Sequence, residues 1–221
     1  MLERKEKGTL ELMSAELGAF QTNCYIIANP VTKEAVVVDP GAEAEAIQGI
    51  LTEKGYTLEA VMLTHGHVDH MGALEDLRSI YGEDLKVLAA AIEQEVLMVA
   101  DYNLTGEVTG TPYTTHGNVM FKGKKQEFEI LGEKWYYMLT PGHTKGSCCY
   151  YLPSYNWIFA GDTLFYGSVG RCDLPTGDEG ELMRSVNDVL MGLPDDTQVF
   201  PGHGPATTIG NERKTNPYVR R

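Results

Sequence analysis

Three histidines and one aspartate stand close together in one short segment, which reads THGHVDH. On a helix, residues two positions apart face nearly opposite ways, so His65 and His67 could share a metal ion only at a strand end or in a turn. Gly66 between them permits a tight backbone path. His70 begins an expected helix and points elsewhere, where Asp69 can join it. The spacing therefore predicts two adjacent metal ions, one on each side of the segment.

The other histidines strengthen this prediction. His143 in TPGHTKGS and His203 in FPGHGP share a Pro-Gly-His pattern, and Asp162 follows an apolar run in FAGDTLF. A buried, unpaired carboxylate is costly, and a bound metal removes that cost. Each residue alone is more simply a turn histidine or a capping aspartate, but together they favour a metal site. His116, in TPYTTHGNV, has no such setting and is expected to be an ordinary loop histidine.

Asp39 has three interpretations. It follows an apolar run in VVVDPG. It could be a metal ligand, a partner that orients a ligating histidine, or the first residue of an Asp-Pro-Gly turn. We favour the last two about equally.

The elements that must position these residues are short strands with helices between them. Strand-like runs cover residues 24–28, 35–39, 60–64, 86–90, 135–139, 148–152, 157–161 and 198–202, and helical patterns cover 43–55, 70–82, 91–102 and 180–193. Mixed strands and helices predict a layered α/β domain. No linker, repeat or low-complexity segment divides the sequence, so we expect a single domain over residues 1–221.

Five of these strands are each followed by a residue whose side chain can bind a metal ion. The residues that follow them are Asp39, His65, His143, Asp162 and His203. Open α/β sheets build their sites at the carboxyl ends of neighbouring strands. We therefore expect these side chains to meet at one edge of the fold.

The amino-acid composition indicates which kinds of binding partner are disfavoured. The chain has 221 residues and a formal net charge of −13, which disfavours nucleic acid because phosphate binding requires clustered Lys and Arg. No signal peptide and no run of about 18 apolar residues is present, so we expect no membrane contact and a cytoplasmic location. The four cysteines include no C-x-x-C pair and are expected to be reduced and mostly buried.

The motifs THGHVDH, PGHTKGS, AGDTLF and PGHGP together resemble the metallo-β-lactamase superfamily, from about Asn23 to about Asn216. The resemblance implies a four-layer αβ/βα sandwich with two ions at one edge. Carried over to this sequence, it places one ion on His65, His67 and His143, the other on Asp69, His70 and His203, and Asp162 as a bridge. An aspartate at 162, where one subclass of true β-lactamases has cysteine, argues against antibiotic hydrolysis as the main task.

Within the superfamily the sequence is similar to the glyoxalase II branch, through TNCYIIANP, GDTLFYGSVGRCDLPTGD and PGHGPATTIGNERKTNP. Arg171 falls where those enzymes place a basic residue that contacts glutathione, although an ion pair with Asp173 or Asp178 is nearly as good an interpretation. Asp173 stands where they have tyrosine. The sequence ends soon after Pro217, so we expect it to lack their C-terminal glutathione-binding region.

The expected chemistry is hydrolysis of a small thioester such as S-D-lactoylglutathione. Two ions about 3.5–4 Å apart hold a shared water and lower its pKa from about 15.7 toward about 7. We assign catalytic roles to Asp69 and Asp162, with Asp162 fixing the separation. A thiolate with a pKa of about 8.5 leaves without a dedicated acid, whereas an amide nitrogen requires one.

The expected metal is zinc, although His and Asp ligands also accept iron or manganese. The main alternative is a persulfide dioxygenase on the same fold, which the resemblance around GRCD also implies. Such an enzyme uses one iron, held by a set such as His65, His143 and Asp162.

Overall fold

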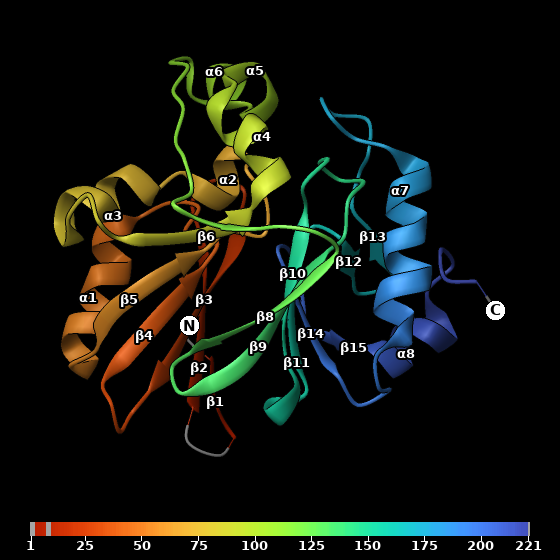
Figure 1. Cartoon of the computed structure of the whole chain (residues 1–221), viewed down its shortest axis with the longest axis horizontal. Helices are drawn as coiled ribbons and strands as arrows, with labels where there is room; N and C mark the ends of the chain where they lie inside the picture. The colour runs from red at the N-terminus through yellow and green to blue at the C-terminus, as the bar shows by residue number, and fades with distance from the viewer. Residues whose placement is uncertain (1–2, 8–9, 221) are drawn as a thin grey trace.

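Two β-sheets pack face to face, and helices cover their outer sides (Figure 1). The computed structural model describes residues 3–7 and 10–220. The larger sheet has the strand order β1-β2-β3-β4-β5-β6-β7, and the smaller has β15-β14-β11-β10-β9-β8. A short hairpin, β12-β13, lies beside them. The predicted four-layer αβ/βα sandwich is confirmed.

The larger sheet mixes antiparallel and parallel pairs. Its strands are β1 (Glu3–Lys7), β2 (Leu10–Leu17), β3 (Thr22–Asn29), β4 (Glu34–Val38), β5 (Thr57–Met62), β6 (Lys86–Ala90) and β7 (Val119–Phe121). The pairs from β1 to β4 are antiparallel and those from β4 to β7 are parallel. Helices supply the crossovers that parallel strands require.

The smaller sheet is mainly antiparallel. Its strands are β8 (Lys125–Ile130), β9 (Glu133–Leu139), β10 (Cys148–Leu152), β11 (Trp157–Gly161), β14 (Gln198–Pro201) and β15 (Thr207–Thr208). The hairpin strands are β12 (Leu164–Phe165) and β13 (Ser168–Val169). Only β11 and β14 pair in parallel within this sheet.

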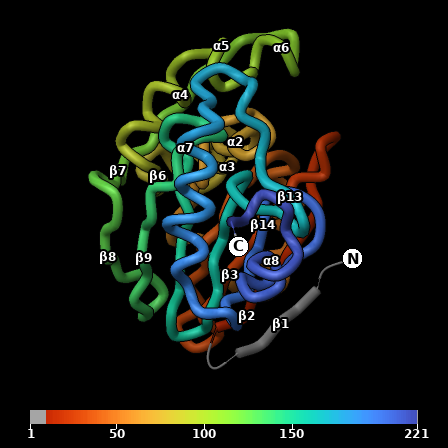
Figure 2. The backbone as a smooth tube through the Cα atoms, turned by 90° about the vertical axis from the view of Figure 1, so that its right-hand side faces the viewer, coloured from red at the N-terminus to blue at the C-terminus, as the bar shows by residue number. Residues whose placement is uncertain are grey.

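The helices fall into three groups (Figures 1 and 2). The larger sheet is covered by α1 (Ala44–Lys54) and α3 (Leu74–Tyr81), with the short α2 (Val68–Met71) at its edge. The smaller sheet is covered by α7 (Glu179–Arg184) and α8 (Ile209–Thr215). A third group, α4 (Gln94–Met98), α5 (Ala100–Asn103) and α6 (Thr105–Thr109), projects at one end. We call residues 94–109 the helical cap.

Strands of the inner layers are apolar on both faces because each face meets a different core. In β4, Val36 points into the cluster between the sheets and Val37 into the cluster under α1 and α3. In β10, Cys148 joins the central cluster and Cys149 joins the cluster under α7. Such strands read as continuous apolar runs. The four cysteines are unpaired, and three of them are buried, as the sequence predicted.

Three predicted helices are less regular than their patterns indicated. The predicted helix 70–82 is divided into α2 and α3, because Gly72 lies against the backbone of Gly41 and the Ala73 N–H bonds to the Pro40 carbonyl at 2.9 Å. The predicted helix 91–102 is a 3₁₀ turn, Ala91–Glu93, followed by α4 and α5. The predicted helix 180–193 changes from α7 to a π-helix (Ser185–Val189) and a 3₁₀ turn (Leu190–Gly192).

Several strands were not predicted. In β8, only Ile130 is buried, so its sequence KQEFEI carries little apolar signal. In β2, the sequence LELMSAEL includes acidic and small residues, which obscured its strand character. Their partners in the sheets, rather than their own composition, determine these strands.

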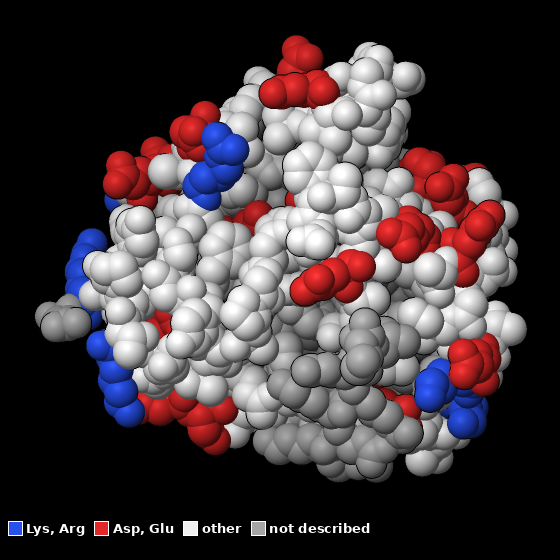
Figure 3. All heavy atoms as spheres, turned by 180° about the vertical axis from the view of Figure 1, so that it is seen from behind, with Lys and Arg blue, Asp and Glu red and all other residues white. Residues whose placement is uncertain are grey.

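The surface matches the acidic composition. Acidic side chains are spread over the face shown in Figure 3, and basic ones stand in small groups toward its margin. No helix among residues 3–7 and 10–220 is long and apolar enough to cross a membrane.

Candidate metal centre

The strand ends that the sequence singled out meet at one edge of the two sheets. Strands β9, β11 and β14 run in the same direction, because β9 and β11 are both antiparallel to β10 and β14 is parallel to β11. The loops after them therefore emerge together, beside the loops after β4 and β5. This edge brings together all seven predicted ligands, which are His65, His67, Asp69, His70, His143, Asp162 and His203.

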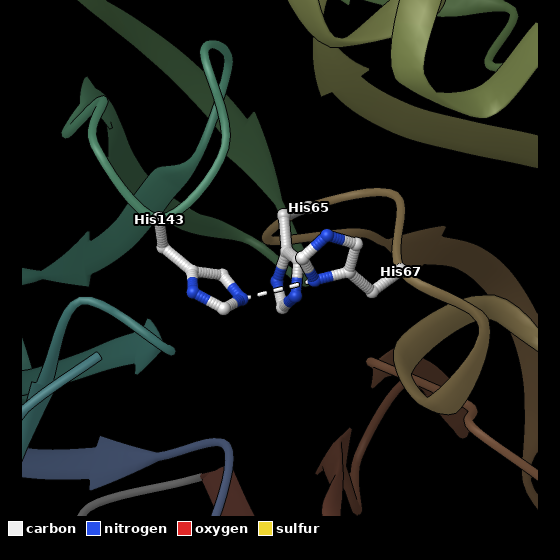
Figure 4. Close-up of side chains that lie close together, drawn as sticks. All are labelled: His65, His67 and His143. Atoms are coloured by element: carbon white, nitrogen blue, oxygen red, sulfur yellow. Dashed lines mark hydrogen bonds between the residues drawn. The ribbon is translucent and has the colours of Figure 1, made fainter. Parts of the chain in front are cut away.

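Three buried imidazoles form one part of the cluster, which we call the three-histidine set. His65 and His67 come from the loop after β5, and His143 comes from the loop after β9 (Figure 4). His67 Nδ1 lies 3.0 Å from His143 Nε2. One nitrogen from each of the three rings lies within 4.8 Å of the others.

A second part, the acidic set, contains Asp69, His70 and His203. Asp69 Oδ2 lies 3.5 Å from His70 Nε2 and 3.2 Å from His203 Nε2. His70 is fully buried, whereas the His203 side chain is 30% exposed. This set therefore opens toward solvent at one side.

Asp162 lies between the two sets. One oxygen, Oδ1, is 3.4 Å from His70 Nε2, and the other, Oδ2, is 3.6 Å from His143 Nε2. Oδ2 is also 3.6 Å from His203 Nε2. The carboxylate thus contacts both sets, as a bridging residue must. Gly202 makes this position possible, because a Cβ there would stand 2.2 Å from Asp162 Oδ1.

The unpaired polar atoms of the cluster fit divalent ions. Among the residues that the structure describes, His65 Nε2, His70 Nε2 and Asp162 Oδ1 are buried and have no hydrogen-bond partner. Buried polar groups without partners are rare and costly. Ligands bonded at about 2.0–2.1 Å to one tetrahedral ion lie about 3.3–3.4 Å apart. The His–carboxylate distances have this magnitude, so the donor set fits the group, while the role of each residue as a ligand stays a prediction.

The electrostatics of the two sets differ. Burial lowers the pKa of His65 well below its usual value, and burial together with His143 lowers the pKa of His67 to about 3. Burial also disfavours charge on His70, but Asp69, Asp162 and Asp39 outweigh it and raise the pKa to about 10. Burial raises the pKa of Asp69, yet the attraction of His70 and His203 outweighs it and leaves that pKa below its usual range.

Asp39 lies behind the acidic set. Its Oδ2 is 3.0 Å from His70 Nδ1, and it accepts hydrogen bonds from Thr64 N at 2.8 Å and Thr64 Oγ1 at 2.6 Å. Its backbone has a φ of 51°, in the left-handed region that few non-glycine residues adopt. These contacts hold the His70 ring in place, and the role of Asp39 behind a metal ligand stays a prediction.

Arg171 has two separate contacts. Its exposed guanidinium pairs with Asp173 through Nε at 2.7 Å and Nη2 at 2.8 Å, which is one of the two ion pairs considered from the sequence. Its main-chain carbonyl lies 2.7 Å from His143 Nδ1 and so orients that ring. The second contact was not predicted, because a backbone carbonyl leaves no signal in residue type.

Other supporting residues were also missed. The Asn23 amide donates to the carbonyls of Pro201 and Gly204, at 3.0 and 2.8 Å, and holds the turn that carries His203. Thr22 Oγ1 donates to Asp69 Oδ2 at 3.2 Å. These residues stand at the start of β3, in the stretch TNCYIIANP, which carries the resemblance to the glyoxalase II branch but assigned them no role. His116 lies outside the cluster and is exposed, as expected.

A cleft of about 890 Å³ opens over the cluster. Its walls come from the turn between β2 and β3, the helical cap, and the hairpin β12-β13. The apolar lining residues are Ala19, Phe20, Val68, Leu104, Val108, Phe165, Val169 and Leu174. Apart from the cluster, Glu107 and Arg171 are the charged groups in the lining. Its size suits a small molecule.

Comparison with known proteins identifies the family. Residues 17–203 match the model of the Metallo-beta-lactamase superfamily. The chain belongs to this superfamily. Membership places it among hydrolases that bind divalent metals.

Relatives within the metallo-beta-lactamase superfamily carry different names. Hydroxyacylglutathione hydrolase GloC of Haemophilus influenzae is 33% identical over 208 residues, covering 91% of this chain and 94% of that protein. A crystal structure of BLEG-1 B3 metallo-beta-lactamase is 36% identical, with a TM-score of 0.87 over 94% of this chain and 98% of that one.

Two further crystal structures bear on the metal and on the reaction. TTHA1623 in a di-iron-bound form is 32% identical, with a TM-score of 0.77 over 93% of this chain and 98% of that one. ETHE1 from Myxococcus xanthus is 26% identical, with a TM-score of 0.74 over 98% of this chain and 83% of that one.

Proposed function

We propose that the protein hydrolyses a small acyl-thioester, S-lactoylglutathione or a related compound, to an acid and a thiol. The observation that carries the proposal is the position of Asp162 between two complete donor sets at the floor of the cleft. Divalent ions at such a centre activate water at neutral pH and polarise a carbonyl. The name of the Haemophilus influenzae relative supports the thioester.

The residues of the centre favour a thioester over an amide. A thiolate with a pKa of about 8.5 leaves without protonation, but an amine needs an acid. Five of the six histidines lie in the cluster, and His116 lies outside it. The described cleft lining offers no further imidazole to protonate an amine.

Each group of residues has a distinct task in this proposal. The three-histidine set and the acidic set would each hold one ion, and the Asp162 carboxylate, which lies between the two sets, would set the distance between the ions. Asp69 and Asp162 supply the negative charge that keeps two cations close together. The apolar cleft walls hold the acyl group and exclude water from it, and Arg171 stands at the rim, where a carboxylate of the thiol carrier would reach it.

Zinc is the proposed metal, because imidazole and carboxylate ligands in this ratio suit it. The same ligands accept iron, and TTHA1623 was crystallised in a di-iron-bound form. A cytoplasmic location stays part of the proposal.

Two other reactions have a specific observation behind them. The resemblance around GRCD keeps a mononuclear-iron persulfide dioxygenase as the alternative, with His65, His143 and Asp162 as its ligands. The likeness to BLEG-1 makes a β-lactam a necessary test substrate. The gathering of a second donor set around His70 favours two ions over one.

One experiment separates these reactions. The purified protein is analysed for metal content and assayed with S-D-lactoylglutathione, a second acyl-thioester, glutathione persulfide and a chromogenic cephalosporin. We expect two ions per chain and release of free thiol from the thioesters. One iron per chain with oxygen uptake on the persulfide would establish the alternative, and cleavage of the cephalosporin alone would replace the thioester as substrate.

A further inference from the structure

A buried carboxylate outside the metal cluster joins the two loops that carry the three-histidine set. Glu93 is 1% exposed and stands at the end of the 3₁₀ turn that precedes the helical cap. It is too deep to meet a substrate, and no motif in the sequence singles it out. Its hydrogen-bond partners lie in the two loops that carry the three-histidine set.

The first contact holds the loop of His65 and His67. The backbone N–H of Gly66, between these two histidines, donates to Glu93 Oε1 at 2.7 Å. Gly66 is also held from the cap side, since a Cβ there would stand 3.0 Å from Leu97 and 3.1 Å from Val96. The loop therefore has little freedom to move relative to the segment that begins at Glu93.

The second contact holds the loop of His143. Thr144 Oγ1 lies 2.9 Å from each Glu93 oxygen and 2.7 Å from Ser147 Oγ, and the Gly146 N–H also donates to the carboxylate. Thr144 is fully buried and follows His143 directly. One carboxylate thus accepts hydrogen bonds from both loops, across 27 residues on one side and 51 on the other.

We propose that Glu93 is a positioning residue that sets the spacing between His67 and His143, and with it the affinity of the three-histidine set for metal. These two rings come from loops of different sheets. One backbone hydrogen bond, from Cys148 N to the Thr64 carbonyl at 2.9 Å, joins the segments beside these loops, and Glu93 joins the loops themselves. A carboxyl group with two oxygens can accept from both loops at once, and a buried donor that loses its acceptor is left with the cost of its desolvation. Partners behind metal ligands change affinity by about 10–100-fold when they are removed.

Glu93 also links the centre to the cleft. The helical cap that follows it carries Leu104, Glu107 and Val108, which line the cleft over the cluster. Because the cap follows directly after Glu93, which joins both loops, the cleft wall and the three-histidine set are held by the same residue. This inference rests on the metal centre of the proposed function but needs no thioester.

The test is the affinity of metal-free protein for Zn²⁺, measured by competition with a chromophoric chelator. We expect Glu93→Ala to weaken binding at the three-histidine set by about 10–100-fold. Glu93→Gln keeps an acceptor for the Gly66 N–H but turns an amide toward the Gly146 N–H, so we expect a smaller loss. The matched control is Glu95→Ala, which removes a glutamate side chain two residues on, where Glu95 is 57% exposed and pairs with Lys145 of the His143 loop.

The thermal midpoint of the metal-free variants separates positioning from general stability. The inference would be overturned if a Glu93 variant that folds had a lower thermal midpoint of unfolding but bound Zn²⁺ with wild-type affinity. An equal loss of affinity in Glu95→Ala would also overturn it, because an exposed ion pair to the His143 loop would then matter as much as the buried Glu93 side chain. A wild-type protein that binds Zn²⁺ but cleaves no thioester would contradict the proposed function and leave this inference intact, whereas a wild-type protein without Zn²⁺ affinity would contradict both.

Discussion

The three-histidine set and the acidic set differ in what surrounds them. The first is buried, contains imidazoles alone, and is tied from behind by Glu93 and the Arg171 carbonyl. The second contains a carboxylate, carries Asp39 behind His70, and includes the half-exposed His203. The first set is built as a rigid, neutral site, and the second as a charged and more open one. A centre of this kind can hold one ion firmly and leave room for substrate at the other.

The largest effect is expected where the two sets meet. Asp162→Ala removes a contact from both at once, so we expect thioester turnover to fall by on the order of 10³-fold or more. Turnover and metal content are measured on the same preparation, with circular dichroism to show that the fold is kept. Asp173→Ala, which removes an exposed carboxylate near the cleft, should retain most activity. Wild-type turnover in Asp162→Ala would show that the two sets do not act together.

The next largest loss of turnover is expected when one predicted ligand is removed from each set in turn. His67→Ala opens the buried set, where no water can easily take the place of the ring, and we expect turnover to fall by more than about 100-fold. His203→Ala opens the exposed side, where water can replace the ring, and we expect a loss of about tenfold. Metal analysis of each variant shows which ion is lost. Equal losses of turnover would remove the distinction between a rigid and an open set.

A pH experiment separates the sets by charge. Three carboxylates hold the pKa of His70 at about 10, so in metal-free protein it is protonated at pH 7 and must release a proton when metal binds. His65 and His67 are already neutral there. We expect the affinity of the acidic set to fall about tenfold for each unit of pH decrease, with a flatter dependence for the three-histidine set.

Calorimetry of Zn²⁺ binding in buffers with different ionisation enthalpies counts the released protons. His67→Ala reports on the acidic set and His203→Ala on the three-histidine set. Proton release that is equal in the two variants would contradict the assigned charges.

The smallest effect is expected at the rim of the cleft. Arg171→Ala should raise KM for a glutathione thioester more than it lowers kcat. Because the guanidinium is 62% exposed and already paired with Asp173, we expect a change of about two- to fivefold. Initial rates over a range of substrate concentrations give both constants. An unchanged KM would show that the ion pair is the only role of this side chain.

The sequence predicted the ligand cluster better than the elements that support it. His, Asp and Gly at strand ends indicate metal binding by their residue types alone. Several such residues in one chain are hard to explain without a metal. Strands such as β4 were visible because both faces are buried. Strand β8 was not, because its residues are mostly exposed and its partner β9 determines its conformation.

The supporting contacts could not be predicted for a physical reason. Glu93, Asn23 and the Arg171 carbonyl act through contacts between segments far apart in sequence. Residue type gives no indication of such contacts, since a glutamate within a helical pattern is usually solvated. Asp39 was the exception, because its place at the end of a buried strand suggested both a turn and a partner for histidine.

The most direct test of the central claim is anomalous diffraction from crystals grown with Zn²⁺. We expect two separate peaks, one among His65, His67 and His143 and one among Asp69, His70 and His203, with the Asp162 carboxylate between them. A single peak that leaves either set without metal, or a map with no peak at this edge of the sheets, would contradict it.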